Sequence, residues 1–309
     1  MVCVGGSVAV SGVLAGAPFY FAEAIRYALA CVLLVVIARL TGRPLLAPRG
    51  AETLWLCAVA ITGLVIFNIA LVQGSRHAEP AVLGVAVASV PALLAIVGPL
   101  IDSSRPRARA VAAALMVTCG AVLVQGLGRS DAIGVGYAVV VFACEAGFTL
   151  LAMPVLRRHG PWSVSVHATW MAALIYAGLG LARERPAAVA NLGARDWLAV
   201  GYLALMVTAV AFVLWWTSVG RLGPGRAGLL TGIAPVAAAI TGVLLGGPAP
   251  RPLVWAGLAV VAIGLTVGLR EDGLIPAGRG RWNRARSGRW PARRAGRRSG
   301  GRPAAGPAG

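Results

Sequence analysis

One segment of this chain occurs twice. Residues 80–120 align without a gap with residues 224–264, and 12 of the 41 positions are identical, where chance in a chain this rich in Ala, Gly, Val and Leu would give about 4. Pro91 and Pro235 form one of the identical pairs. Both copies are apolar enough to lie in a membrane, and a duplicated half in a membrane protein is the usual architecture of a secondary transporter. The repeat therefore indicates that the protein moves something across a membrane.

The composition also indicates a membrane protein. The 309 residues are 58% hydrophobic and only 12% charged, which is typical of a chain with several membrane spans and not of a soluble domain of this length. All basic residues are arginine, which we attribute to coding bias and not to a special arginine chemistry. The five cysteines occur singly in apolar segments, so we expect them to pack in helices and predict neither a metal site nor a cofactor.

Ten apolar segments are close to the length of about 20 residues that a helix needs to cross a bilayer. We therefore predict an all-α integral membrane protein with ten transmembrane helices, arranged as two repeats of five helices at 1–127 and 132–270. The ten segments are 1–15, 18–38, 53–73, 80–101, 108–127, 132–155, 162–182, 196–218, 225–246 and 253–270.

The arginines in the loops predict the orientation. With the N-terminus inside, the inner loops hold ten arginines and the outer loops hold six, and the C-terminal tail adds eleven more to the inner side. The positive-inside rule favours this arrangement. We therefore expect a multi-pass protein of the cell (inner) membrane with both termini in the cytoplasm. Since each half has an odd number of spans, the two halves enter the membrane in opposite directions, and the repeat is an inverted one.

The first expected span is shorter than its counterpart in the second half. Segment 1–15 covers about 22 Å of a hydrocarbon core of about 30 Å, whereas its counterpart runs from 132 to 155. We expect that the natural start of the protein lies roughly ten residues upstream. The alternative is a short first helix around which the bilayer thins.

The last segment, 276–309, consists mainly of Gly, Arg, Pro, Ala and Ser. Such a composition cannot bury a core, and we expect a disordered cytoplasmic tail. One interpretation is a basic strap on anionic inner-leaflet lipid, with Trp282 and Trp290 at the level of the headgroups. The other interpretation is a solvated tail with no required role. Arg and Gly alone do not specify RNA binding, so no nucleic-acid partner is expected.

Glu145 is the most informative ionisable residue, because it lies near the middle of the sixth expected span with no arginine within reach on the same helix. Charged groups in hydrocarbon are costly and usually functional. A carboxyl group in such surroundings can bind and release a proton, which suits a proton-coupled carrier or a cationic substrate. The structural alternative is a protonated glutamate that forms a hydrogen bond across the helix bundle.

Glu23 and Arg26 lie three residues apart near the start of the second expected span, so they share one helix face. In the structural interpretation they form an ion pair that merely neutralises itself. In the functional alternative, Arg26 binds an anionic group of the substrate or gates the cavity, and the neighbouring Tyr27 forms an aromatic wall.

His167 and Trp170 lie at the same spacing in the seventh expected span. His167 could titrate near neutral pH or serve as a hydrogen-bonded packing residue, and Trp170 is a candidate for lining the cavity. In the third span, Asn68 and Gln73 are expected to form hydrogen bonds between helices, with substrate contact as the alternative.

Pro91 and Pro235 lie at equivalent points of the fourth and ninth spans, and each frees the carbonyl four residues earlier. Freed carbonyls in hydrocarbon need a partner, so such kinks occur where a helix faces protein or a wet cavity. We expect the two prolines to form gating kinks, with static kinks as the alternative. Trp215 and Trp216, near the end of the eighth span, are expected in the aromatic belt at the membrane interface.

Motifs of enzymes are missing from the sequence. The chain contains no nucleophile elbow, no zinc-protease motif and no phosphate-binding loop, and its three histidines are dispersed. We therefore predict that the protein is not an enzyme. Without a nucleotide-binding motif, this chain is not driven directly by ATP, and coupling to an ion gradient or downhill flow remains.

These features resemble the drug/metabolite transporter superfamily, specifically its EamA-type transporters, over about residues 1–270. The resemblance implies ten spans in two five-span repeats and export of amino acids, other small metabolites or drugs. The residues that carry it are Gly6 and Ser7 in the first span, Arg26 in the second, Gly120 in the fifth, the segment 221–230 that runs on to Pro235, and Gly257 and Gly264 in the last span.

The chain departs from the family pattern in two places. The family often has glutamate just after the fourth and ninth helices, whereas this chain has Asp102, Ser103 and Ser104 after the fourth and Gly247 and Pro248 after the ninth. The first helix of the family normally begins further upstream, which agrees with the expected upstream start.

Taken together, the residues and the resemblance predict a secondary transporter. We expect it to export a small metabolite, amino acid or drug by alternating access, with proton coupling. The expected partners are a small-molecule substrate, the lipid bilayer and, as a candidate, a second copy of the chain in a homodimer. The alternative function is that of a membrane scaffold or lipid-binding protein that acts through its basic tail.

Overall fold

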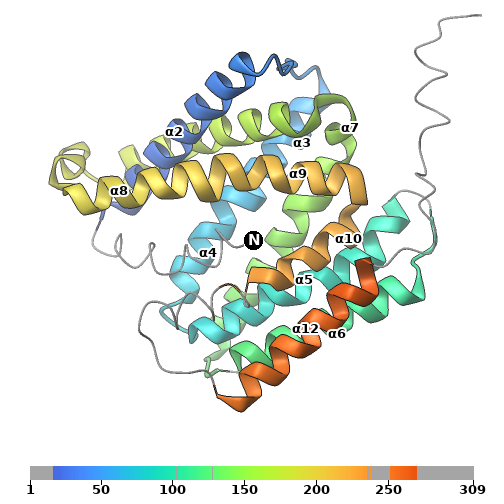
Figure 1. The fold of residues 1–309 in the computed structure, drawn as a ribbon. Coiled ribbons are helices and arrows are strands. Elements are labelled where there is room, and N and C mark those ends of the chain that lie inside the picture. Colours follow the sequence, from blue (N-terminus) through green and yellow to red (C-terminus); the bar gives the residue numbers. More distant parts are fainter. Residues whose placement is uncertain (1–16, 102–103, 127, 235–236, 238–250, 270–309) are drawn as a thin grey trace, which may run out of the picture. The chain divides into compact units, whose positions relative to one another are not determined.

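Helices make up the regular structure of the described residues, which are 17–101, 104–126, 128–234, 237 and 251–269 of a computed structural model (Figure 1). These residues belong to one compact unit, Met1–Arg270. The helices in chain order are α2 (Phe19–Leu40), α3 (Ala51–Val59), η2 (Ala60–Ile66), α4 (Phe67–Gly74), α5 (Pro80–Ile101), α6 (Ala108–Gln125), α7 (Ala132–Arg183), η3 (Pro186–Asn191), α8 (Ala194–Tyr202), η4 (Leu203–Val210), α9 (Ala211–Leu222), α10 (Pro224–Leu229), η5 (Leu230–Gly232) and α12 (Pro252–Leu269).

The predicted all-helical fold is confirmed for this part of the chain. Seven helical runs among the described residues are long and apolar enough to cross a membrane. One of them, α7, has 52 residues and covers both the sixth and the seventh predicted spans. The other runs match predicted spans. The first predicted span, half of the ninth span including Pro235, and the tail at 276–309 lie outside the described residues.

A sharp kink at Gly160 divides α7 into two legs. Gly160 has φ 69° and ψ 174°, a backbone conformation that is essentially restricted to glycine. A straight helix of this length would measure about 78 Å, far more than a hydrocarbon core of about 30 Å. The kink, followed directly by Pro161, therefore separates two helical legs that each have the length of a membrane span.

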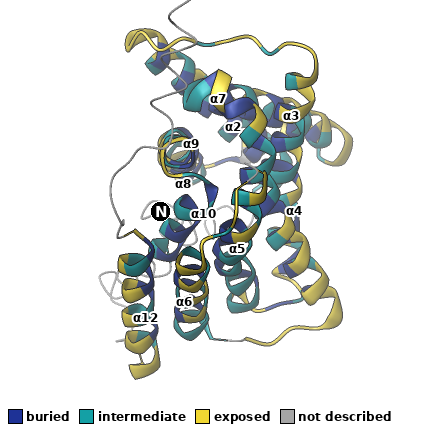
Figure 2. Ribbon diagram, turned by 90° about the vertical axis from the view of Figure 1, so that its right-hand side faces the viewer, coloured by how far each residue is buried: buried dark blue, intermediate teal, exposed yellow. Residues whose placement is uncertain are grey.

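Exposed residues lie along the helices (Figure 2), and many of them are large and apolar. Leu40, Leu54 and Leu198 expose 82%, 73% and 74% of their surface. A soluble monomer rarely exposes so much apolar surface in contiguous patches, whereas lipid covers such surface without cost. Burial on the inside and exposure on the outside of the same apolar helices fit a bundle that is surrounded by lipid.

Helices α6 and α12, the last helices of the two sequence repeats, pack closely through glycine. A Cβ atom built on Gly120 would lie 2.8 Å from the Gly257 carbonyl oxygen, and one built on Gly264 would lie 3.1 Å from the Ala113 carbonyl oxygen. The repeat offset of 144 residues takes Gly120 onto Gly264 and Ala113 onto Gly257. The two contacts are therefore equivalent, as at a two-fold interface, and the two helices run antiparallel.

Two ion pairs join the loop after α4 to the loop before α7. His77 Nδ1 lies 2.9 Å from Asp131 Oδ2, and Arg129 Nε lies 3.0 Å from Glu79 Oε1. The hydrogen bond from Arg129 holds the pKa of Glu79 below its ordinary value. The pKa of Asp131 is also lowered, first by the backbone N–H of Gly134 and then by His77. Both loops belong to the side predicted to face outward.

A second group of contacts joins the loop after α2 to the kink of α7. Glu52 pairs with Arg158, and its Oε2 atom lies 3.1 Å from His159 Nε2. The backbone N–H of Leu46 donates to the Ser163 hydroxyl at 3.1 Å. Both segments belong to the side predicted to face inward. Each set of loop contacts thus joins segments that the arginine distribution assigns to the same side of the membrane.

Candidate functional site

Helix α2 carries the first group of candidate site residues, and the end of α7 fixes its position. The helix begins directly after Pro18, which leaves the N–H groups of its first turn without partners in the helix. The N–H groups of Tyr20 and Phe21 each donate to the Glu184 carboxylate at 3.0 Å. A carboxylate at a helix N-terminus also interacts favourably with the helix dipole. This cap anchors α2 against the second leg of α7.

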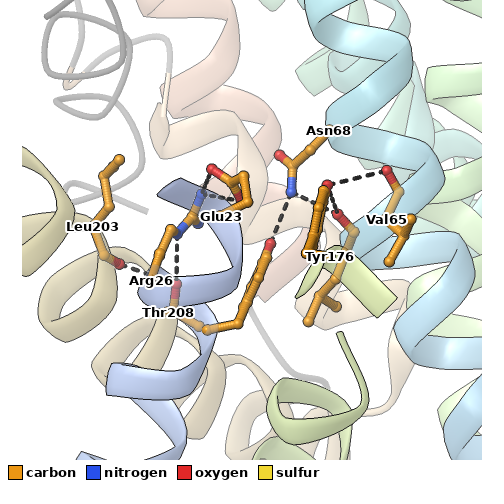
Figure 3. Close-up of polar contacts among 9 residues, drawn as sticks. Glu23, Arg26, Val65, Asn68, Tyr176, Leu203 and Thr208 are labelled. Atoms are coloured by element: carbon orange, nitrogen blue, oxygen red, sulfur yellow. Dashed lines mark hydrogen bonds and ion pairs between the residues drawn. The ribbon is translucent and has the colours of Figure 1, made fainter. Parts of the chain in front are cut away.

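Glu23 and Arg26 form the predicted ion pair inside the bundle. Arg26 Nη1 lies 3.1 Å from Glu23 Oε1, and the two side chains expose only 11% and 9% of their surface. Arg26 Nε also donates to the Thr208 hydroxyl of η4 at 3.1 Å. A buried pair contributes little net stability compared with apolar packing, but removal of one partner leaves a costly unpaired charge. The pair therefore keeps Arg26 charged and oriented within the bundle (Figure 3).

Asn68 and Tyr176 hold Tyr27 from the other side of the bundle (Figure 3). The Asn68 amide donates to the Tyr27 hydroxyl at 2.8 Å, and the Tyr27 and Tyr176 rings stack with their centroids 5.8 Å apart. The predicted hydrogen bond between helices is therefore present for Asn68. The half-buried Gln73 side chain has no hydrogen bond to another described residue, so for Gln73 the hydrogen bond between helices stays a prediction.

The repeat offset takes Glu23 and Arg26 onto His167 and Trp170, and these residues also form a pair. Trp170 Nε1 donates to His167 Nδ1 at 3.0 Å, while His167 Nε2 lies 2.8 Å from the Leu46 carbonyl oxygen. These partners fit a neutral ring with its proton on Nε2. Trp170 is 38% exposed, unlike its buried counterpart Arg26. The two halves therefore share a polar pair at equivalent positions but differ in how deeply they bury it.

Glu145 lies midway along the first leg of α7, about 20 Å from Ala132 and from Gly160 at about 1.5 Å per residue. Its half-buried carboxylate has no hydrogen bond or ion pair within the described part of the chain. An apolar groove of about 290 Å³ between α5 and α7 ends at Phe142, less than one helical turn away. The structural alternative, a hydrogen bond across the bundle, finds no partner among the described residues.

The chemistry available to the site is that of binding. Glutamate, arginine, tyrosine, asparagine and histidine supply charge and hydrogen bonds. In the part of the chain that the structure describes, no group of three or more His, Cys, Asp or Glu side chains is placed to hold a metal ion.

Comparison with known proteins decides the family. The chain matches the EamA-like transporter family over residues 1–125 and 132–269. The chain belongs to this family. It is therefore a multi-pass membrane transporter, and the resemblance seen in the sequence is confirmed.

The relatives of this EamA-family chain carry transporter names. The chain is 24% identical over 257 residues to the uncharacterized transporter YetK of Bacillus subtilis, with 80% of this chain and 78% of YetK covered. It is 24% identical over 240 residues to a protein of Streptantibioticus cattleyicolor named "Probable terminal-alkyne amino-acid exporter", with 75% and 80% covered. A solved crystal structure shares the fold with a TM-score of 0.74 at 21% identity, covering 87% of this chain and 93% of that one.

Four buried polar atoms of this transporter lie on α7 and α9, have no hydrogen-bond partner among the described residues and were not expected from the sequence. They are Thr149 Oγ1, His159 Nδ1 and the indole nitrogens of Trp215 and Trp216. Trp216 packs against Phe148, with ring centroids 4.6 Å apart, so the prediction that the two tryptophans belong to the interfacial belt is wrong. Thr149 lies four residues after Glu145, hence on the same helix face. That spacing was the one signal in the sequence that could have pointed to it.

Pro91 lies buried in α5 at the contact with α10, the first part of the equivalent helix in the second half. A Cβ atom on Gly228 of α10 would lie 3.4 Å from the Pro91 Cα atom. The Thr118 hydroxyl donates at 3.0 Å to the carbonyl of Ala88, one residue after the carbonyl of Val87 that proline frees. Pro91 therefore faces protein and has a side-chain donor beside the carbonyl that it frees, as membrane helices require.

Proposed function

We propose that this transporter exports a small metabolite, amino acid or drug by alternating access and couples the export to protons. The observation that carries the proposal is the carboxylate of Glu145, which lies halfway along a membrane-length helical leg and has no hydrogen bond or ion pair with another described residue. Such a group is costly in hydrocarbon and persists where it binds protons or cations. Glu145 would bind a proton and a cationic group of the substrate alternately. This exchange would couple the movement of the proton to the movement of the substrate.

Inverted repeats would provide the two alternating states. We propose ten spans in two five-helix repeats, 1–127 and 132–270. The two ranges matched by the family coincide with these halves. Helices that are equivalent in the two repeats, α6 and α12, meet antiparallel through paired contacts of Gly120 and Gly264, and antiparallel equivalents require a two-fold axis in the membrane plane. Repeats related in this way rock about a site between them.

Contacts between loops support the assignment of these loops to the same sides of the membrane, and the arginine distribution supports the proposed orientation. The ion pairs of His77 and Glu79 join two loops on the proposed outer side. The pairs of Glu52 join two segments on the proposed inner side. Both termini would then lie in the cytoplasm. This orientation would present the basic tail to anionic lipid of the inner leaflet.

Complementary charges in the bundle favour a substrate with an amine and an acidic group. In this proposal Arg26 receives the acidic group, and Glu145 receives the amine or a proton. Tyr27 and Trp170 would line the cavity, and Thr149 would offer a hydroxyl one turn from Glu145. An amino acid fits this description, and one relative is named as an amino-acid exporter. Pro91 and Pro235 would form the paired gating kinks, and Glu23, Asn68, Gln73 and His167 would complete the polar lining.

Efflux from proteoliposomes tests the proposal. Vesicles loaded with the twenty proteinogenic amino acids and a mixture of small metabolites are given a pH gradient, and lost compounds are measured by mass spectrometry. We expect one chemical class to leave faster with the gradient. Glu145→Gln should abolish the gradient-dependent part while the protein stays folded. Glu79→Gln, which changes a carboxylate of the outer loops, should retain it.

Two outcomes would contradict the proposal. Gradient-dependent efflux that is unchanged in Glu145→Gln would remove Glu145 from the mechanism. If folded wild-type protein exported none of the compounds, the alternative of a scaffold acting through the tail would gain weight, and deletion of residues 276–309 would then be the next test.

A further inference from the structure

Two π-helical segments occupy equivalent places in the two halves of the chain. The segments are η2 (Ala60–Ile66) and η4 (Leu203–Val210), and the repeat offset of 144 residues takes 60–66 onto 204–210. π-helix accounts for well under about 1% of residues in globular proteins and occurs mostly as short insertions at functional sites. Because both segments lie at the same repeat offset, we attribute them to the duplicated fold and not to chance.

Side-chain groups bond to backbone carbonyls of both π segments. The Tyr176 hydroxyl lies 3.0 Å from the Leu64 carbonyl oxygen of η2. The Asn68 amide donates to the same oxygen at 2.7 Å. In η4, the Thr208 hydroxyl donates to the Leu203 carbonyl at 3.0 Å. A carbonyl oxygen can accept two hydrogen bonds, and a membrane interior offers no water for either of them.

The side chains that serve these carbonyls also hold two neighbouring residues of α2 (Figure 3). Thr208 accepts from Arg26 Nε at 3.1 Å, and Asn68 donates to the Tyr27 hydroxyl at 2.8 Å. Arg26 and Tyr27 are adjacent in sequence, and the guanidinium carbon lies 5.0 Å from the Tyr27 ring centroid. One point of α2 is thus tied to a π segment in each half of the molecule.

The hydrogen bonds that link α2 to η2 and to η4 involve different residue types in the two halves. The repeat offset takes Leu64 onto Thr208 and Asn68 onto Phe212. The donor to the π carbonyl therefore lies within the segment in the second half and after it in the first half. Since the residue types differ while the function of each tie is the same, the sequence repeat alone does not explain them.

We propose that Thr208 is a positioning residue for Arg26, and that it couples the substrate-binding group on α2 to the π register of both halves. If η4 returned to the α-helical register, Thr208 would turn about the helix axis, because an α-helix has fewer residues per turn than a π-helix. The Thr208 hydroxyl would then move away from Arg26 Nε. A ligand that binds the positioned Arg26 therefore favours the π register, and the reverse holds by linkage. This inference rests on the proposed function, in which Arg26 receives the acidic group.

Hydrogen–deuterium exchange in lipid nanodiscs tests the coupling without a substrate. Thr208→Val keeps the shape of the side chain and removes the hydroxyl, so we expect amides of 203–210 to exchange about tenfold faster, as loss of a hydrogen bond to a charged group implies. Amides of 60–66 should also exchange faster, because Arg26 is tied to that segment through Tyr27. Thr208→Ser keeps the hydroxyl, so the amides of both segments should exchange at the wild-type rates. Thr217→Val, whose hydroxyl donates only to Val213 of its own helix at 2.6 Å, should change neither.

The transport assay gives the second readout. With the amino-acid mixture as probe, Thr208→Val should raise KM for the exported compound about tenfold and leave kcat nearly unchanged, since it misplaces a binding group. Faster exchange confined to 203–210, or failure of Thr208→Ser to restore exchange, would overturn the inference. If wild-type protein exports none of the probes, the proposed function fails, and the exchange of 60–66 still decides the coupling.

Discussion

Single side chains in this bundle each serve several partners. The Asn68 amide donates both to the Tyr27 hydroxyl at 2.8 Å and to the Leu64 carbonyl at 2.7 Å. Both acceptors lie in the apolar interior, where an unpaired polar group is expensive. Positions of this kind should be sensitive to changes that leave size and apolar packing intact.

Asn68→Leu should therefore destabilise the protein by about 1–3 kcal/mol, because it keeps the volume and leaves the Tyr27 hydroxyl without its donor. The free energy of unfolding is measured by denaturation in detergent micelles. Gln73→Leu is the matched control on the same helix, and it should change stability by less than about 0.5 kcal/mol. Equal effects of the two substitutions would show that the hydrogen bond to Tyr27 carries no special weight.

The outer loops should separate in acid. The pKa values of Glu79 and Asp131 are lowered by Arg129, by Gly134 and by His77. A carboxyl group with a lowered pKa contributes stability fully above its unfolded-state pKa, about 4, and loses it as pH falls through the folded-state pKa. Exchange protection of the Glu79 and Asp131 amides, which bond across the loops at 2.9 and 3.2 Å, should be present at pH 6 and lost near pH 3.

Asp131→Asn separates charge from geometry in that experiment. The amide oxygen can still accept from Gly134, but the ionisable group is gone, so protection should depend less on pH than in the wild type. Protection that is equally high at both values of pH in the wild-type protein would contradict the assignment of these pairs as the link between the loops.

At the residue scale, the sequence predicted the surroundings of charged side chains better than those of neutral polar side chains. The pairing of Glu23 with Arg26 and the isolation of Glu145 follow from charge in apolar spans, which few residues can satisfy. Thr208 and Tyr176 escaped prediction because hydroxyl groups are common in membrane helices and do not reveal their partners. Trp215 and Trp216 were wrongly placed, since a tryptophan pair near a span end has the same pattern whether it faces lipid or the bundle.

Among the elements, α7 depends on one glycine. Gly160 adopts φ 69° and has nothing within 4 Å of the position where a Cβ atom would lie, so a side chain there meets backbone strain and no clash. The kink turns one helix into two membrane-length legs and brings Arg158 and His159 to Glu52. Both the unusual backbone conformation and the contacts of Glu52 therefore depend on this one residue.

Gly160→Ala should destabilise the protein by about 1–3 kcal/mol, the cost of a residue with a side chain in this region of backbone space. Gly178→Ala in the second leg of α7 is the control, because Gly178 also has open space around it and alanine favours a helix by about 1 kcal/mol. Unfolding in detergent gives both values. A neutral Gly160→Ala together with an unchanged contact of Glu52 would show that the kink does not need glycine.

At the scale of the elements, hydropathy predicts where the spans begin and end. It does not predict whether the hydrogen bonds within them follow the α-helical or the π-helical pattern. The fourth predicted span, 80–101, coincides with α5 (Pro80–Ile101), because proline and charge bound it on both sides. The break at Gly160 was expected as a turn between two helices, and the non-helical backbone of Gly160 confirms it. The π segments were not predicted, because one inserted residue shifts the ladder without changing the apolar pattern that the sequence displays.

For the whole molecule, the repeat connects the observations at the smaller scales. The same offset relates the identical prolines, the paired glycines of α6 and α12, the π segments and the two polar pairs. The sequence predicted this duplication because it survives as identity in 80–120 and 224–264. Elsewhere the equivalence persists only in structure, as between Arg26 and Trp170, since different residues can fill equivalent places in a bundle.

Distances between spin labels test alternating access most directly. In protein whose five native cysteines are replaced, one labelled pair is placed at the exposed Arg76 and Arg195 on the proposed outer side, and another at the exposed Arg43 and Arg221 on the proposed inner side. We predict two distance populations for each pair in nanodiscs. On a change from pH 8 to pH 5, one pair should shift to longer and the other to shorter distances, and Glu145→Gln should abolish the shift. Single distances that stay the same in all conditions would contradict alternating access between the two halves.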